Sequence, residues 1–191
     1  MSTPTKFFVF DFETTGTDPS KHAPIEIAAI VLDMATLKEV DRFETLMKPF
    51  EGAEIDKQAM AVNGITAEQL KTAPEPDVAF RNLKAFAERH GMMYAVAHNI
   101  DFDWDFLKAA EVRHKIWAVP LEKCKIDTQA LAIWTLGRSG QLKTFGLKSL
   151  LNHFNLDKTG HHRAMFDVEQ LVEVMRKMAD YKPAMQMGLF G

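Results

Sequence analysis

The sequence of 191 residues contains only one cysteine, Cys124, which excludes an intramolecular disulfide. Small secreted scaffolds depend on disulfides, so that class of protein is not indicated. Runs of about 18 apolar residues are also absent, which excludes a membrane-spanning helix. The first residues, Met1–Lys6, are polar and lack the apolar core of a signal peptide. We therefore expect a protein of the cytoplasm that has no membrane partner.

An excess of positive charge is missing as well. The chain has 23 lysines and arginines against 26 aspartates and glutamates, a formal net charge of −3. A protein that holds nucleic acid only by neutralising phosphates is normally basic. Either nucleic acid is not the partner, or the positive charge has another source, such as a metal ion.

The composition, 47% hydrophobic and 26% charged, is typical of a globular domain. Apolar runs predict strands at Phe7–Glu13, Ile25–Leu32 and Glu39–Met47, and their short connections predict an antiparallel meander. Further strands are predicted at Met92–Ala97, Ile116–Val119 and Lys123–Ile126. Helical patterns predict helices at Asp77–His90, at Ile100–Val112, from the N-cap Asp127 to Trp134, at Leu147–Phe154 and at Ala164–Ala179.

Together these elements predict one α/β domain of three layers, in which helices flank a mixed central sheet. We expect this domain to span residues 1–182 and a flexible tail to span residues 183–191, because Pro183 ends the last helix.

Two carboxylates interrupt the hydrophobic pattern of the first strand. Asp11 and Glu13 are alternate residues, so their side chains share one face, with Cα atoms about 7 Å apart. Two like charges at a strand end repel unless a cation lies between them. A solvated pair at a sheet edge is the alternative interpretation.

A third carboxylate lies on the wrong face of a helix. At about 100° per residue along Ile100–Val112, Asp103 falls about 100° from Phe102, inside the apolar arc. Asp101 and Asp105 fall outside this arc, and we expect solvent around both. Asp103 is therefore the acid predicted to be buried.

The last helix repeats this pattern. Viewed down the axis of the predicted helix Ala164–Ala179, Asp167 falls between Val174 and Met178. It is the single charged residue of the apolar arc of this helix. A buried aspartate can instead accept hydrogen bonds from a backbone donor or pair with a lysine.

Buried carboxylates are costly unless they are paired or bind a metal. If Asp11, Glu13, Asp103 and Asp167 converge, their oxygens would suit a hard divalent cation such as Mg²⁺ or Mn²⁺. His162 follows His161 directly before the Asp167 helix and is placed to accept a proton from water at such a site, although a lone histidine is often structural.

Three segments resemble, in order, the three motifs of the DEDDh 3′–5′ exonucleases, among them the proofreading subunit of bacterial DNA polymerase III, exonuclease X, RNase T and oligoribonuclease. The segments are Asp11-Phe12-Glu13-Thr14-Thr15-Gly16, His98-Asn99-Ile100-Asp101-Phe102-Asp103 and His162-Arg163-Ala164-Met165-Phe166-Asp167. The resemblance spans about residues 6–180.

The resemblance implies a ribonuclease H-like fold and a mechanism with two divalent metal ions, Mg²⁺ or Mn²⁺. It implies five catalytic residues, of which Asp11, Glu13, Asp103 and Asp167 hold the ions and His162 is the general base. It also implies substrate contacts by Thr14, Thr15, Gly16, Asn99 and Phe102. The helical position of Phe102 favours core packing over stacking on a base.

The expected activity is hydrolysis of DNA from a free, single-stranded or frayed 3′ end, in proofreading or repair. An RNA-directed 3′–5′ exonuclease differs only in substrate and stays open, as does a non-catalytic adaptor on a nuclease fold. A phosphatase of the haloacid dehalogenase type is not favoured, because Glu13 stands where that family needs aspartate.

The C-terminal segment Gln186-Met187-Gly188-Leu189-Phe190 resembles the linear motif by which bacterial replication proteins bind the sliding clamp. Gln186 would form hydrogen bonds at the rim of a pocket that Leu189 and Phe190 fill. Packing of Leu189 and Phe190 on the domain is the alternative. The sliding clamp, and with it a DNA polymerase, are the expected protein partners.

Overall fold

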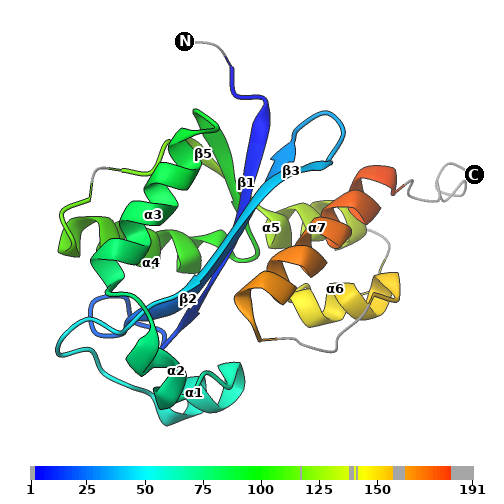
Figure 1. Cartoon of the computed structure of the whole chain (residues 1–191). Coiled ribbons are helices and arrows are strands. Elements are labelled where there is room, and N and C mark those ends of the chain that lie inside the picture. Colours follow the sequence, from blue (N-terminus) through cyan, green and yellow to red (C-terminus); the bar gives the residue numbers. More distant parts are fainter. Residues whose placement is uncertain (1–2, 117, 138–139, 141, 157–161, 182–191) are drawn as a thin grey trace, which may run out of the picture.

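The computed structural model describes residues 3–116, 118–137, 140, 142–156 and 162–181. Its centre is a five-stranded sheet in the order β3-β2-β1-β4-β5 (Figure 1). The strands are β1 (Lys6–Thr14), β2 (Pro24–Asp33), β3 (Glu39–Leu46), β4 (Met93–Ala97) and β5 (Leu121–Asp127). The helices of the described residues are α1 (Lys57–Asn63), α2 (Ala67–Thr72), α3 (Pro76–Glu88), α4 (Ile100–Arg113), α5 (Thr128–Leu136), α6 (Leu147–Phe154) and α7 (Ala164–Asp180).

The predicted antiparallel meander is confirmed. β1 pairs antiparallel with β2, and β2 pairs antiparallel with β3. The run Ile25–Leu32 is buried along its whole length, as expected for a strand covered on both faces. β3 alternates between exposed and half-buried residues, because it forms the edge of the sheet.

The other side of the sheet is parallel, so the sheet is mixed, as predicted. β4 pairs parallel with β1, and β5 pairs parallel with β4. The predicted strand at Ile116–Val119 is wrong, since the described residues of that stretch form no strand. Val119 is instead a buried core residue in a loop, and its N–H donates to Oε1 of the buried Glu111, 2.9 Å away. A side chain of α4 thus provides the hydrogen-bond acceptor that a neighbouring strand would otherwise provide.

The side-chain alternation of β1 divides the core into two layers. Phe8, Phe10 and Phe12 face the layer of α3 and α4. Val9 faces α7. Since Asp11 and Glu13 continue the alternation of Val9, both carboxylates point to the side of the sheet that α7 covers.

The predicted helices are confirmed at their positions, with ends that match or differ by at most two residues. Asp127 caps α5 as predicted, because its side chain accepts a hydrogen bond from the N–H of Gln129. α5 and α6 pack on α7, away from the sheet. None of the helices in the described part of the chain is long and apolar enough to cross a membrane. The predicted tail begins just beyond the described residues.

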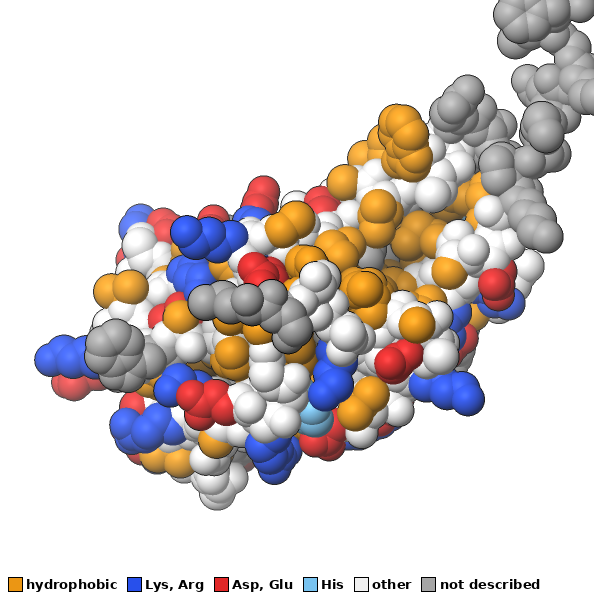
Figure 2. Space-filling view, turned by 90° about the horizontal axis from the view of Figure 1, so that it is seen from above, with side chains coloured by type: hydrophobic (Ala, Val, Ile, Leu, Met, Phe, Trp, Pro, Cys, Tyr) orange, Lys and Arg blue, Asp and Glu red, His pale blue; other side chains and the backbone are white. Residues whose placement is uncertain are grey.

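Acidic and basic side chains are interspersed over the face that Figure 2 shows, and hydrophobic side chains gather on one side of it. The described side chains of this face therefore form no large patch of a single charge, which agrees with the near balance of charge in the sequence.

Candidate active site

The structure brings together carboxylates that lie more than 150 residues apart in the sequence. Asp11 and Glu13 stand at the end of β1, and Asp167 lies near the start of α7. One oxygen from each of the three lies within 4.8 Å of the other two. Asp167 is only 7% exposed, as its place in the apolar arc predicts. These three acids form the group that we call the carboxylate cluster.

Asp103 reaches the same strand end from the opposite layer. It is 2% exposed, and its Oδ1 accepts a hydrogen bond of 3.0 Å from the N–H of Phe12, the residue between Asp11 and Glu13. The pairing of β1 with β4 stops at Val9, so β4 does not extend to this N–H. Asp103 occupies the place that a neighbouring strand would otherwise fill.

The other two aspartates of α4 lie where the helical pattern predicts. Asp101 is an exposed residue whose carboxylate pairs with Lys125, 2.5 Å away. Asp105 is exposed as well. Helical periodicity therefore selects the buried residue correctly among the three aspartates.

Burial and mutual repulsion act against ionisation of these carboxyls. The pKa of Asp11 is raised well above its ordinary value by burial and then by the charges of Asp103, Glu13 and Asp167. Burial, followed by the charge of Asp167, raises the pKa of Glu13 to about 8. Burial raises the pKa of Asp103 to about 8. A divalent cation would relieve this repulsion, and a set of only carboxylate oxygens fits Mg²⁺ or Mn²⁺.

His162 lies beside the cluster at the entrance of α7. Its backbone N–H donates to Oδ2 of Asp167 at 3.2 Å, and the residue is exposed to solvent. Its φ of 73° is uncommon for a residue other than glycine. The backbone thus turns sharply here and holds the exposed residue His162 next to Asp167. His161 lies outside the described residues.

Thr14, Thr15 and Gly16, predicted as substrate contacts, build the turn after β1. The Thr14 hydroxyl donates to the carbonyl of Gly16, and the Thr15 hydroxyl donates to that of Glu54, both at 2.7 Å. A Cβ on Gly16 would lie 2.3 Å from the ring of His22, so only glycine fits. All three residues are buried. Their contact with substrate stays a prediction.

Asn99 and Phe102 lie at the start of α4. Asn99 is exposed, has a φ of 62° and donates its N–H to Oδ1 of Asp127 at 3.0 Å. Phe102 is partly buried, with its ring 5.0 Å from that of Phe106, and it packs against the core. This packing agrees with the core interpretation, and a contact of either residue with a base stays a prediction.

Glu26 is a neighbour of the cluster that the sequence patterns did not single out. It lies on β2 opposite Glu13 and is 1% exposed. Both of its oxygens accept hydrogen bonds from Arg163, the residue before α7. The available signal was one acid inside the apolar run Ile25–Leu32. Gln186, Leu189 and Phe190, the predicted clamp-binding residues, lie outside the described residues.

Comparison with solved structures confirms the predicted fold class. The chain is similar to E. coli exonuclease I in complex with a dT13 oligonucleotide, with a TM-score of 0.76 and 18% identity over 91% of this chain and 41% of the other. It is also similar to the nuclease domain of 3′hExo, a DEDDh family member bound to rAMP, with a TM-score of 0.75 and 18% identity over 94% of both chains. At these identities the likeness establishes the ribonuclease H-like fold alone.

Sequence comparison gives closer relatives. The chain is 32% identical over 179 residues to the PolC-type DNA polymerase III of Thermotoga petrophila. The match covers 90% of this chain and 12% of the polymerase, so the chain spans about an eighth of its relative. The family model described as exonuclease, of the RNase T type, matches residues 8–175. This match includes α4 and most of β1 and α7, which carry Asp11, Glu13, Asp103 and Asp167. The chain therefore belongs to the RNase T-type exonuclease family.

Proposed function

We propose that the protein is a 3′–5′ exonuclease that hydrolyses DNA from a 3′ end with two divalent metal ions, in proofreading or repair. The observation that carries this proposal is the convergence of Asp11, Glu13 and Asp167 within 4.8 Å at the end of β1. Three acids this close in a partly buried place are unfavourable without a cation, and the family to which the chain belongs acts on phosphodiesters.

The four acids have distinct tasks in this proposal. Asp11, Glu13 and Asp167 would hold Mg²⁺ or Mn²⁺, and Asp103 would join them from the layer of α4. Bound divalent ions would supply Lewis-acid activation of water and neutralise charge at the scissile phosphate. By holding the N–H of Phe12, Asp103 also fixes the strand that carries the first two acids. Ions held by the carboxylate cluster would therefore provide the positive charge that a chain of net charge −3 lacks.

His162 is the general base of the proposal. Its exposed side chain can reach a water molecule that approaches the carboxylate cluster from solvent. The neutral imidazole would accept the proton of the attacking water as the new phosphorus–oxygen bond forms. The bond from phosphorus to the 3′ oxygen of the preceding nucleotide breaks, and this oxygen takes a proton from solvent, which leaves a shorter strand with a 3′ hydroxyl and a nucleoside 5′-monophosphate. The hydrogen bond from its backbone N–H to Asp167 holds His162 close to the carboxylate cluster.

The relatives support DNA as substrate. They are PolC-type DNA polymerases, at 31–34% identity over 85–91% of this chain. An exonuclease that works with a DNA polymerase would remove nucleotides at the growing 3′ end, which is the proofreading role proposed here. We propose the same role for this chain, with a DNA polymerase as its partner.

The test uses DNA and RNA oligonucleotides of the same sequence, each labelled at the 5′ end. With Mg²⁺ or Mn²⁺ we expect the DNA to shorten one nucleotide at a time from its 3′ end, and we expect a chelator to stop the reaction. Faster shortening of the RNA would contradict the proposed substrate and favour an RNA exonuclease. No shortening of either strand would contradict the activity and favour a non-catalytic adaptor.

We further propose that Gln186, Leu189 and Phe190 bind a bacterial-type sliding clamp. Deletion of residues 184–191 is expected to abolish co-elution with the clamp in size-exclusion chromatography, because the two apolar anchors are lost. Metal-dependent hydrolysis is expected to stay within about twofold of the wild type, since every residue of the carboxylate cluster is retained.

A double substitution, Leu189→Ala with Phe190→Ala, serves as the finer variant of the same test, and Met185→Ala with Met187→Ala is its matched control. Only the variant with Leu189→Ala and Phe190→Ala is expected to lose co-elution with the clamp. Undiminished co-elution of the deletion variant would rule out the tail as the binding segment.

A further inference from the structure

Glu26 is a fifth acid next to four others, and its place needs a physical reason. It is 1% exposed and lies opposite Glu13 in the register of β1 and β2, so the two side chains share the face that α7 covers. Its negative charge adds to the repulsion among the carboxylates. An apolar residue would suit the rest of this buried strand better. Whatever Glu26 contributes must therefore come from its hydrogen bonds.

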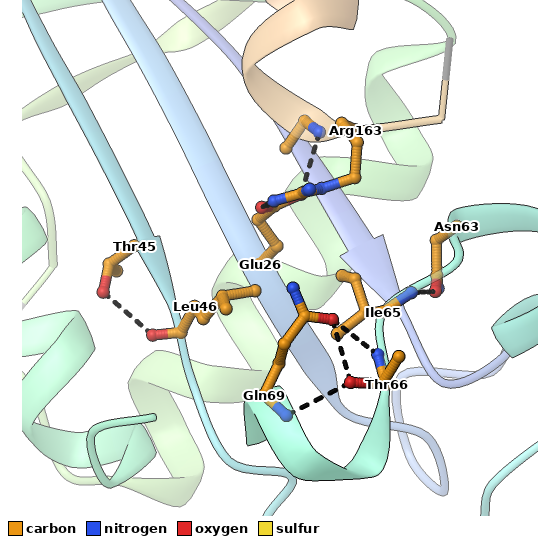
Figure 3. A network of polar contacts seen from close by, with 9 residues as sticks. Glu26, Thr45, Leu46, Asn63, Ile65, Thr66, Gln69 and Arg163 are labelled. Carbon is orange, nitrogen blue, oxygen red and sulfur yellow. Dashed lines mark hydrogen bonds and ion pairs between the residues drawn. The ribbon is translucent and has the colours of Figure 1, made fainter. Parts of the chain in front are cut away.

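Those hydrogen bonds all lead to the start of α7, as Figure 3 shows. Nε of Arg163 lies 3.2 and 3.1 Å from the two carboxylate oxygens of Glu26, and Nη2 lies 2.5 Å from Oε1. The N–H of Ala164 donates to Oε2 at 3.0 Å. The carboxylate thus binds a fork of side-chain donors and one backbone donor together.

The backbone contact makes Glu26 the cap of α7. The N-cap residue, Arg163, makes no side-chain hydrogen bond to the first turn of its own helix. The first N–H groups of a helix need acceptors, and a negative charge is favourable at this end. Glu26 supplies both from a strand that precedes the helix by more than 130 residues.

The first turn of α7 is also the part of the helix that carries chemistry. The N–H of Asp167 donates to the carbonyl of Arg163 at 3.0 Å, so the aspartate is one helical turn from the contact with Glu26. His162 precedes Arg163 directly and donates its N–H to Asp167. A shift of this turn would move Asp167 and His162 together, relative to Asp11 and Glu13.

We propose that Glu26 and Arg163 are positioning residues, which fix the start of α7 on the sheet so that Asp167 completes a divalent-cation site with Asp11 and Glu13. The inference rests on the proposed metal-dependent function. Glu26 and Arg163 touch neither ion nor substrate in it; they act through the position of the helix.

The experiment measures binding of Mn²⁺ by the disappearance of the free-ion signal in electron paramagnetic resonance, without any nucleic acid. For Arg163→Met and for Glu26→Gln we expect Mn²⁺ affinity to fall by about tenfold or more, which is typical when a group that orients metal ligands is removed. Arg163→Lys keeps the positive charge but not the forked pair of guanidinium donors. Its Mn²⁺ affinity is expected to lie between that of the wild type and that of Arg163→Met. The double variant is expected to lose little more Mn²⁺ affinity than either single variant, since both substitutions remove the same contact.

Arg176→Met is the matched control. Arg176 lies on the same helix, and its Nη2 donates to the carbonyl of Leu37 at 2.8 Å, so it also ties α7 to the β-meander, through the turn between β2 and β3 near the other end of the helix. We expect its Mn²⁺ affinity to equal that of the wild type. An equal loss in Arg163→Met and Arg176→Met would show general loosening of α7 and overturn the proposal, as would wild-type affinity in Arg163→Met. If the wild type and Asp167→Asn bind Mn²⁺ equally weakly, the proposed metal site itself fails, which is a distinguishable result.

Discussion

Asp167→Asn is expected to slow the metal-dependent shortening of DNA on the order of 10³-fold or more. Asparagine keeps the size of the side chain and an oxygen that can accept from the N–H of His162, but it removes the charge that the cation needs. Bound ions supply several kcal/mol to reactions of phosphate esters, and about 1.4 kcal/mol is worth a factor of ten in rate. The measurement is the single-turnover rate on a 5′-labelled DNA oligonucleotide with saturating Mg²⁺.

Asp180→Asn is the control for this substitution. It makes the same chemical change at the exposed end of the same helix, far from the carboxylate cluster. Its rate is expected to equal that of the wild type. If Asp167→Asn retains more than about a tenth of the wild-type rate, Asp167 is not a ligand on which the reaction depends.

The burial of Asp103 and Asp167 could be predicted from the sequence because an α-helix fixes the angle between residues. Once the apolar arc of α4 is known, one of its three aspartates lies inside the arc and two lie outside, and the structure has the same arrangement. Asp11 and Glu13 share one face because they are alternate residues of one strand, which is a local relation too. These residues are predictable because the relation that matters spans only a few positions of the chain.

Convergence of the acids depends on relations that span the whole chain. Asp103 reaches β1 only because the pairing of β1 with β4 ends at Val9 and exposes the N–H of Phe12. No periodicity reports where a pairing ends. The resemblance to known motifs supplied this information, whereas the spacing of residues within the sequence did not.

The partner of Glu26 was beyond prediction for a related reason. β2 is covered on both faces, so its hydrophobic pattern does not say which layer a given side chain meets. Arg163 follows 137 positions later. The stretch Ile116–Val119 shows the opposite error, since a short apolar run suits a strand and a buried loop equally well.

The raised pKa values predict how stability depends on pH when a chelator removes divalent cations. The folded pKa of Glu13 and of Asp103 is about 8, against ordinary values of 4.5 and 3.8. Between these limits the folded protein holds protons that the unfolded chain has released. The free energy of unfolding therefore falls as the pH rises, and the contribution of these groups, present below about pH 4, is lost by about pH 8.

We expect the midpoint of thermal unfolding in chelator to fall by at least about 5 °C between pH 5 and pH 8, given that about 1 kcal/mol shifts it by 2–4 °C in a chain of this size. Asp103→Asn removes one of the buried acids and is expected to flatten this slope and to raise stability at pH 8. Asp105→Asn, an exposed acid of the same helix, is expected to leave the slope unchanged.

Added Mn²⁺ is expected to stabilise the wild type more strongly as the pH rises, because ligand carboxylates must lose their protons before they bind a cation. The same ion is expected to stabilise Asp103→Asn less. Equal slopes for the wild type and Asp103→Asn in chelator would mean that the buried acids are not held protonated. In that case repulsion among the carboxylates could not be the reason why the cluster binds a cation.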